Sequence, residues 1–181
     1  SSSVILQFDP TNTNSHVVKF NNAIGVTWER MTINALGLDY GRVFQLSLHS
    51  LDNRIQHCAI NGLNTSSASD AFACIYSDGT NSGNVFLGNT IKNGSYGILH
   101  DIYSSYVEGF DIHHNRIENF STTGLELPFT SGLKIVGNTV ISSKNAAVGI
   151  IVSSVIDSMV PRGHRRRLRP GHLVAVRFPT G

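Results

Sequence analysis

The stretch Ile112-His-His-Asn115-Arg-Ile117 is one of five copies of a motif that determines the fold. Each copy holds an apolar residue, two variable residues, a turn residue, one variable residue and a second apolar residue. The other copies are Trp28-Glu-Arg-Met31-Thr-Ile33, Ile55-Gln-His-Cys58-Ala-Ile60, Phe86-Leu-Gly-Asn89-Thr-Ile91 and Ile135-Val-Gly-Asn138-Thr-Val140. Their turn residues are 27, 31, 26 and 23 residues apart. This period predicts a stacked fold, in which each unit buries its apolar face against its neighbours.

A second apolar motif alternates with the first. It occurs at Val18-Lys-Phe20, Phe44-Gln-Leu46, Cys74-Ile-Tyr76, Gly97-Ile-Leu-His100, Gly124-Leu-Glu-Leu127 and Gly149-Ile-Ile-Val152. Apolar residues at i and i+2 are typical of a strand with one face inward, so each repeat holds at least two short strands. No repeat has a periodic segment of helix length. We therefore predict an all-β fold, a right-handed, single-stranded parallel β-helix (solenoid) of about five to six coils.

The alignment of the repeats also predicts the interior. The apolar residues that open and close each copy of the first motif should form two core columns. At the turn position, Asn tolerates left-handed backbone and bonds well at a corner. Asn89, Asn115 and Asn138 are expected to form an amide ladder between coils, with Met31 and Cys58 breaking it toward the N-terminus. Cysteines 58 and 74 are interpreted as small buried hydrophobic residues.

Composition divides the chain into two parts. All 16 Asn lie before residue 146, and residues 157–181 hold six Arg and no Lys. We therefore place the β-helix domain at 1–156 and an Arg-rich C-terminal tail at 157–181. Three origins of the tail stay open: a non-native or frameshifted segment, a genuine closing strand through Leu173–Phe178, or a polyanion-binding tail.

Other sequence features limit location and partners. The chain begins at Ser1, so we expect a mature or excised fragment. No apolar run approaches the roughly 20 residues of a membrane span. Nucleic acid is not an expected partner, because the tail lacks interleaved aromatic residues. Exposed solenoid ends would favour a homo-oligomer.

The repeats resemble a known family. Gly41-Arg-Val-Phe-Gln-Leu46, Asn93-Gly-Ser-Tyr-Gly-Ile98 and Gly137-Asn-Thr-Val140 look like parallel β-helix repeats of the pectin lyase-like superfamily, and are similar to repeats of large bacterial surface and secreted proteins. The resemblance covers about residues 4–156. It implies an extracellular or cell-surface bacterial protein that interacts with polysaccharide, as a glycoside hydrolase, a polysaccharide lyase, or a non-catalytic structural or adhesin-like solenoid.

The richest polar patch lies in the coil around residues 101–118, where we expect Ile112–Ile117 to form one strand with Asp111, Arg116 and Glu118 pointing outward. Candidate catalytic carboxylates are Asp111, Glu118, Asp101 and Glu126. Candidate substrate-binding residues are His113, Arg116, His114, Tyr103 and Tyr106. A carboxylate and a His on one sheet would abstract a proton next to a uronate carboxyl, with Arg116 neutralising that carboxyl. If so, Asp111→Ala should remove activity and leave the fold intact, and retained activity would reject the role of Asp111.

A structural interpretation of the same residues competes with the catalytic one. The alignment places Lys134 beside Asp111 and Lys92 beside Glu118, as ordinary cross-strand ion pairs. For glycoside hydrolysis, which needs two carboxyls across a groove, the pairs to test are Asp101 with Glu108 or Asp111, and Glu126 with Glu118.

Other candidates carry less chemistry. His100 is expected to be a satisfied core or corner residue. Glu126 is assigned to an outward column with Gln45, Ile75, Leu99 and Ile151, whose mostly apolar surface fits sugar stacking or protein contact. His57 and His114 occupy equivalent positions two coils apart, about 9.6 Å, which is too far to share a zinc ion. No metal and no cofactor is expected.

Overall fold

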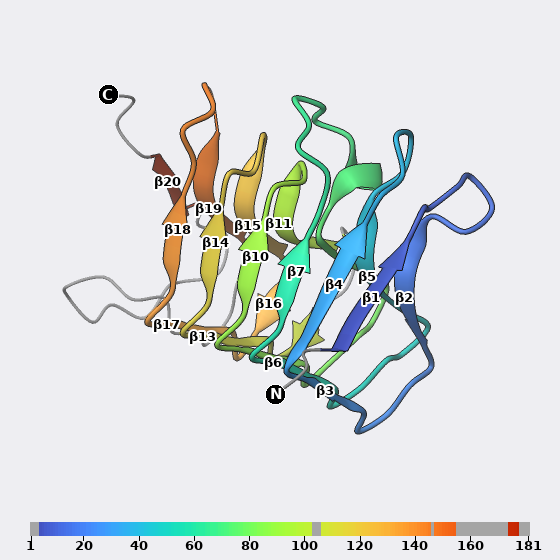
Figure 1. Ribbon diagram of the computed structural model, residues 1–181. Helices are drawn as coiled ribbons and strands as arrows, with labels where there is room; N and C mark the ends of the chain where they lie inside the picture. Colours follow the sequence, from blue (N-terminus) through green and yellow to red (C-terminus); the bar gives the residue numbers. More distant parts are fainter. Residues whose placement is uncertain (1–3, 103–105, 146, 155–173, 178–181) are drawn as a thin grey trace.

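Three parallel sheets run along the computed structural model and form a β-solenoid of about six turns (Figure 1). The structure describes residues 4–102, 106–145, 147–154 and 174–177. Sheet A contains β1 (Val4–Phe8), β4 (Met31–Ala35), β7 (Ala59–Asn61), β10 (Thr90–Lys92), β14 (Arg116–Glu118) and β18 (Thr139–Ile141). Sheet B contains β2 (His16–Asn21), β5 (Arg42–Ser47), β8 (Ile75–Asp78), β11 (Tyr96–Asp101), β15 (Thr123–Pro128), β19 (Val148–Ser153) and β20 (Val174–Arg177).

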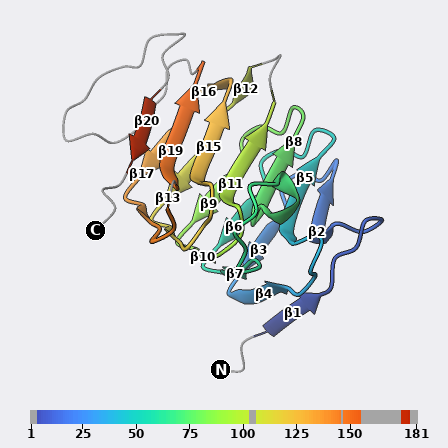
Figure 2. The ribbon, with the colours of Figure 1, turned by 90° about the horizontal axis from the view of Figure 1, so that it is seen from above.

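The third sheet completes the coil. Sheet C contains β3 (Thr27–Glu29), β6 (Arg54–Gln56), β9 (Val85–Leu87), β13 (Asp111–His113) and β17 (Lys134–Val136). A full coil runs from a strand of sheet C, around a tight corner into sheet A, and through a longer connection into sheet B. Figure 2 shows the successive coils side by side along the solenoid. A two-stranded sheet of β12 (Val107–Glu108) and β16 (Thr130–Ser131) joins two connections, and a short 3₁₀ helix, η1 (Asp70–Phe72), precedes β8.

The predicted core columns are confirmed. In sheet C, Trp28, Ile55, Phe86, Ile112 and Ile135 lie in register on successive strands. In sheet A, Ile33, Ile60, Ile91, Ile117 and Val140 do the same. All except Trp28, which lies nearest the N-terminal end, are buried. Each coil thus buries its apolar residues between the coils on either side.

The amide ladder is confirmed as well. The Oδ1 of Asn115 accepts two hydrogen bonds from Asn89, one from its backbone N at 2.9 Å and one from the Asn89 Nδ2 at 3.0 Å. Asn138 Oδ1 accepts the same two bonds from Asn115, at 2.8 and 2.9 Å. Asn89 Oδ1 accepts a bond from the backbone N of Cys58 at 2.9 Å, where the ladder of side chains ends. Each asparagine therefore satisfies backbone groups that the corner removes from the sheets.

The backbone of this corner differs from the prediction. The left-handed residues are those that precede the turn residues: Arg30, His57, Gly88, His114 and Gly137, with φ between 55° and 65°. The asparagines avoid this conformation because their side chains point inward; Asn89 and Asn115 are 1% and 2% exposed. The expectation that Ile112–Ile117 forms one strand is therefore wrong: the corner at His114 separates β13 in sheet C from β14 in sheet A.

Further asparagine pairs stack at other positions. Asn53 Nδ2 donates to Asn84 Oδ1 at 3.1 Å, and both residues are buried. Asn61 Nδ2 donates to Asn34 Oδ1 at 2.8 Å, and Asn119 Nδ2 donates to Asn93 Oδ1 at 2.6 Å. These stacks account for much of the high Asn content of the chain.

The two ends of the solenoid differ. At the N-terminal end, edge strand β1 exposes Val4 and Ile5. At the other end, β20 pairs antiparallel with β19. It lies in the span Leu173–Phe178, where a closing strand was one of three alternatives for the tail. Residues 155–173 and 178–181 lie outside the described residues. A homo-oligomer formed through these ends stays a prediction. Within the described part of the chain, no helix is long and apolar enough to cross a membrane.

Replacing Asn115 by alanine should destabilise the protein by about 2–4 kcal/mol. The change leaves the buried backbone N of Asn89 and O of Phe86 without their hydrogen bonds, and each unsatisfied buried group costs about 1–3 kcal/mol. Urea unfolding followed by circular dichroism measures the loss. Asn138→Ala, at the more exposed end of the ladder, should cost less; equal stability of Asn115→Ala and the wild type would contradict a structural role for the ladder.

Candidate functional site

The outward face of sheet B carries a row of side chains at one position of each coil. The row is Lys19, Gln45, Tyr76, Leu99, Glu126 and Ile151, in register from β2 to β19. The sequence-based assignment of Ile75 to this row is wrong, because Ile75 is fully buried in the inward row with Phe44 and Ile98. Cys74 and Ile75 are both fully buried and only Ile75 lies within β8, so an in–out alternation counted from Cys74 puts Ile75 and Tyr76 on the wrong faces. The row therefore contains an aromatic hydroxyl and is more polar than expected.

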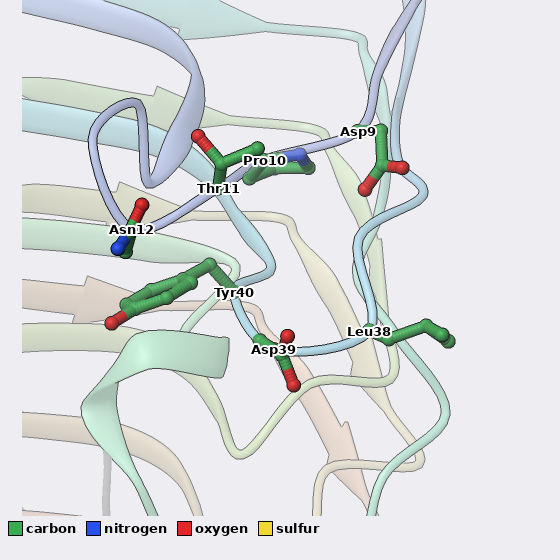
Figure 3. A pocket seen from close by; sticks show the side chains of 7 residues that line it. All are labelled: Asp9, Pro10, Thr11, Asn12, Leu38, Asp39 and Tyr40. Carbon is green, nitrogen blue, oxygen red and sulfur yellow. The ribbon is translucent and has the colours of Figure 1, made fainter.

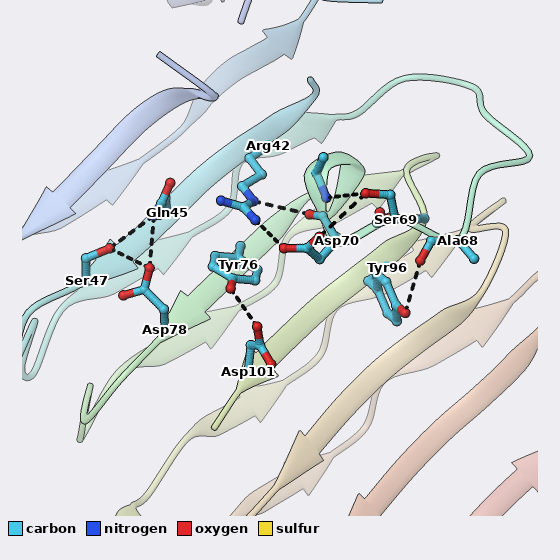
Figure 4. Close-up of polar contacts among 12 residues, drawn as sticks. Arg42, Gln45, Ser47, Ala68, Ser69, Asp70, Tyr76, Asp78, Tyr96 and Asp101 are labelled. Carbon is cyan, nitrogen blue, oxygen red and sulfur yellow. Dashed lines mark hydrogen bonds and ion pairs between the residues drawn. The ribbon is translucent and has the colours of Figure 1, made fainter. Parts of the chain in front are cut away.

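A chain of polar contacts crosses this face from β5 to β11 (Figure 4). Arg42 forms an ion pair with Asp70, and its guanidinium carbon lies 3.7 Å from the centre of the Tyr76 ring. The Tyr76 hydroxyl donates to Asp101 Oδ2 at 2.7 Å. Burial, together with the nearby Asp101 carboxylate, raises the pKa of Tyr76, so that the hydroxyl stays protonated and continues to donate. Four side chains from different segments are thus held in one arrangement.

Three carboxylates of sheet B each accept a hydrogen bond from a protein hydroxyl. Ser47 Oγ donates to Asp78 Oδ2 at 3.0 Å, where Gln45 Nε2 also donates. Tyr76 donates to Asp101, as described above, and Thr123 Oγ1 donates to Glu126 Oε2 at 3.1 Å.

The three carboxylates come from consecutive strands of the sheet. Asp78 and Asp101 are direct neighbours in register, on strands about 4.8 Å apart. Glu126 follows on the next strand, opposite Leu99. Glu126 is therefore displaced by two residues along its strand from the position opposite Asp101. We call the three side chains the carboxylate line: Asp78 and Asp101 stand side by side along the solenoid axis, and Glu126 is offset from them.

The connection between β7 and β8, residues 62–73, lies along this face, and we call it the strap. Its anchors come from later coils: Ser95 Oγ donates to the O of Ser69 at 2.6 Å, Ser121 Oγ to the O of Ser67 at 2.6 Å, and Lys144 Nζ to Asn64 Oδ1 at 2.8 Å and the O of Thr65 at 2.6 Å. Its last residue, Ala73, packs with Tyr76 and Leu99 of sheet B in a small apolar cluster outside the main core. The strap therefore borders the carboxylate line on one side.

The site residues that we predicted from the sequence are spread over three faces. Asp101 and Glu126 lie on sheet B, Asp111 and His113 on sheet C, and Arg116 and Glu118 on sheet A. His114 is at the exposed corner between sheets C and A, Tyr106 is exposed just before β12, and Tyr103 lies outside the described residues. The pairs Asp101 with Asp111 and Glu126 with Glu118 thus lie on different sheets.

On sheet A, the Glu118 carboxylate is paired with two cations, as the alignment predicted for Lys92. Glu118 accepts bonds from Lys92 Nζ at 2.9 Å and Arg116 Nε at 2.7 Å. The hydrogen bond from Lys92 and the charge of Arg116 lower the pKa of Glu118. On sheet C, Asp111 lies beside Lys134 in register, but among the described residues the two form no ion pair, and Asp111 lies 3.7 Å from His113 Nε2.

A separate pocket of about 600 Å³ lies between the β1–β2 and β4–β5 connections (Figure 3). Its lining residues are Asp9, Pro10, Thr11, Asn12, Leu38, Asp39 and Tyr40. Within the described ranges, in this pocket or elsewhere, no three or more His, Cys, Asp or Glu side chains are grouped so that they could hold a metal ion.

Sequence reasoning missed three residues of sheet B: Arg42, Tyr76 and Asp78. Gln45 was assigned to the outward column, and the structure places it there. A signal for the others was present, because the strand Arg42–Ser47 has polar residues at positions 45 and 47, and Tyr76 and Asp78 show the same spacing of two residues. Counting inward residues of β8 from Ile75, and not from Cys74, would have placed Tyr76 and Asp78 on the outward face.

Comparisons of this chain with protein-family models, curated proteins and solved structures found no match. Function is therefore inferred from the geometry of the chain alone.

His100, next to the site residue Asp101, points into the core and is fully buried, as expected from the sequence. Its Nδ1 lies 3.2 Å from Ser77 Oγ, and its ring packs edge-on against Phe110. Within the described structure, its Nε2 has no hydrogen-bond partner, so the expectation of a satisfied residue is wrong for this nitrogen. Burial lowers the pKa of His100 to about 4, so that the ring is neutral in the folded protein at neutral pH.

This histidine should make folding sensitive to acid. The pKa of His100 in the folded protein is below the unfolded value of about 6.5. The neutral ring therefore contributes its full share to the free energy of unfolding above pH 6.5, and this share is lost as the pH falls toward 4. Between pH 7 and pH 4, the free energy of unfolding of the wild type should fall by about 3 kcal/mol more than that of His100→Gln. Denaturant titrations at a series of pH values measure this difference, and parallel curves for the two proteins would rule it out.

Proposed function

We propose that the chain binds a polysaccharide along the outward face of sheet B. The observation that carries this proposal is the line of three carboxylates, Asp78, Asp101 and Glu126, each already accepting a hydrogen bond from a hydroxyl. A carboxylate offers about four lone-pair sites, so each retains capacity for a further hydroxyl donor. Sugar hydroxyls are such donors.

The fixed geometry of the line supports binding. Carboxylates held by protein donors lose little side-chain freedom when a ligand arrives, which lowers the cost of association. The partly exposed ring of Tyr96 lies on the same face, and an aromatic face beside polar groups suits a sugar ring. The carboxylates come from three successive coils about 4.8 Å apart, an extended arrangement that fits a polymer better than a single small molecule.

The sequence resemblance agrees with this proposal. Repeats like those of the pectin lyase-like superfamily occur in proteins that act on or hold polysaccharide, and an extracellular or cell-surface bacterial location would bring such polymers to sheet B. Both the superfamily and the location are part of the proposal.

A non-catalytic structural or adhesin-like solenoid is the alternative. The matched charges of Lys92, Arg116 and Glu118 on sheet A favour it for that face, because ion pairs between adjacent coils stabilise a scaffold without leaving a free group. This alternative predicts that substitutions on the outward face of sheet B leave the properties of the chain unchanged.

Replacing single carboxylates of sheet B by their amides should weaken binding. Asp101→Asn and Glu126→Gln each remove a charged acceptor, and hydrogen bonds to charged groups contribute about 1.5–3 kcal/mol, so affinity should fall about tenfold or more. Electrophoresis of the full chain through gels containing xylan, mixed-linkage β-glucan or polygalacturonate measures retention. The matched control is Glu118→Gln, which changes the same kind of group on sheet A and should bind like the wild type.

Two outcomes would count against the proposal. Absence of retention on all three polymers would reject polysaccharide binding for these classes, and equal loss with Glu118→Gln would indicate a general effect on folding. New reducing ends or unsaturated products in the same mixtures would identify a hydrolase or a lyase. Hydrolysis has one specific observation in its favour: Asp78 and Asp101 lie in register on adjacent strands about 4.8 Å apart, and a retaining mechanism needs two carboxyls about 5 Å apart.

A further inference from the structure

We propose that Arg42 is a positioning residue of the polysaccharide-binding face: it sets the orientation of Asp101 through Tyr76 and is itself held by the strap. This inference rests on the proposed function of sheet B. It extends the binding site to a residue that does not touch the polymer, and it makes the strap part of the site.

The exposure of the side chains separates the two roles. The Arg42 side chain is 14% exposed, and Tyr76 is 7% exposed. A guanidinium covered in this way is not free to hold an acidic sugar, and the covered Tyr76 ring is not a stacking platform. Asp101 is only half-buried, so it is the member of the chain of contacts that a polymer can reach.

The contact between Arg42 and the strap fixes the plane of the guanidinium. Arg42 Nε donates to the backbone O of Asp70 at 3.2 Å, while a terminal nitrogen pairs with the carboxylate of the same residue. Two bonds to one residue define an orientation, which a single bond does not. The guanidinium carbon then lies 3.7 Å from the centre of the Tyr76 ring. A lysine ammonium cannot reproduce this contact between a planar cation and a ring.

The Tyr76 hydroxyl transmits this position to the carboxylate. A hydroxyl has one hydrogen, and here it is directed at Asp101 Oδ2 at 2.7 Å. The bond occupies one oxygen of Asp101 and limits rotation of the carboxylate, so its other oxygen is held in one direction. A shift of the ring under Arg42 would therefore turn the oxygen available to a sugar hydroxyl.

The strap end of the chain is also well defined. Asp70 begins η1, and the side chain of Ser69 caps this turn by accepting a bond from the backbone N of Ala71. The same segment is tied to the next coil by Ser95. The position of the strap is thus linked through three side chains, Asp70, Arg42 and Tyr76, to the geometry of Asp101.

A double-mutant cycle tests the proposal, because a merely structural role of Arg42 would act independently of the Tyr76 hydroxyl. Arg42→Lys keeps the charge beside Asp70 and removes the planar stack; Tyr76→Phe keeps the ring and removes the bond to Asp101. Each change should weaken retention on the xylan, β-glucan or polygalacturonate gel that retains the wild type by roughly fivefold to tenfold, and the double variant should be no weaker than either. The matched control is Arg116→Lys, which alters an arginine paired with a carboxylate on sheet A and should change nothing.

A second measurement needs no polymer. The Asp101 side-chain carboxyl carbon, followed by NMR in the full-length protein, should shift in the same direction in Arg42→Lys and Tyr76→Phe, and no further in the double variant. An Asp101 resonance that stays at its wild-type position in Arg42→Lys would overturn the proposal.

The outcomes separate the two proposals. If Asp101→Asn loses retention but Arg42→Lys and Tyr76→Phe do not, polysaccharide binding stands and the positioning role is wrong. If the effects of the two substitutions add, Arg42 acts by another route and the positioning role is equally wrong. If the wild type is retained by none of the three gels, the proposed function fails, and the carbon resonance alone decides whether Arg42 controls Asp101.

Discussion

Every coil of this solenoid has to turn a corner without leaving buried backbone groups unpaired, and a buried asparagine side chain meets that requirement. The amides of Asn89, Asn115 and Asn138 bond the backbone of one coil and the amide of the next. The left-handed residue before each of them, Gly88, His114 or Gly137, takes up the change of direction. This division of tasks between two consecutive residues keeps strands of sheets C and A in register along the solenoid, and so determines which side chains meet on every face.

The fold could be predicted from the sequence to a large extent, because period and burial coincide in a solenoid. Ile112 and Ile117 are equivalent to residues of every other coil, so one alignment located two core columns and the Asn ladder. The candidate site was less accessible. Sheet assignment failed for Asp111 and Glu118, since a single left-handed residue, His114, places them on different faces. The outward position of Tyr76 was missed because Cys74 and Ile75 are both buried: Cys74 precedes β8, so an alternation counted from Cys74 is one residue out of step with the strand.

The outward faces of sheets A and B use charge in different ways. On sheet A, Glu118 is paired with Lys92 on the neighbouring strand and with Arg116 on its own strand, so its charge is neutralised. On sheet B, the carboxylates of Asp78, Asp101 and Glu126 are satisfied by neutral donors, so their charge is oriented and not cancelled. The one guanidinium of this network, that of Arg42, is already paired with Asp70 and stacked on Tyr76. The contrast between neutralised and merely oriented carboxylates is what distinguishes the proposed binding face from the rest of the solenoid.

The strap also changes how the coils depend on one another. In a simple solenoid each coil contacts only its neighbours, so terminal coils fray one at a time and folding spreads from any starting point. Here the connection after β7 is bound by Lys144, which precedes the last parallel strand of sheet B, eighty residues from Asn64. Loss of the last coil therefore also releases a contact of the second full coil. The strap makes its bonds to Lys144 only when the last coil is in place, so two coils distant in sequence depend on each other beyond the nearest-neighbour stacking of a simple solenoid.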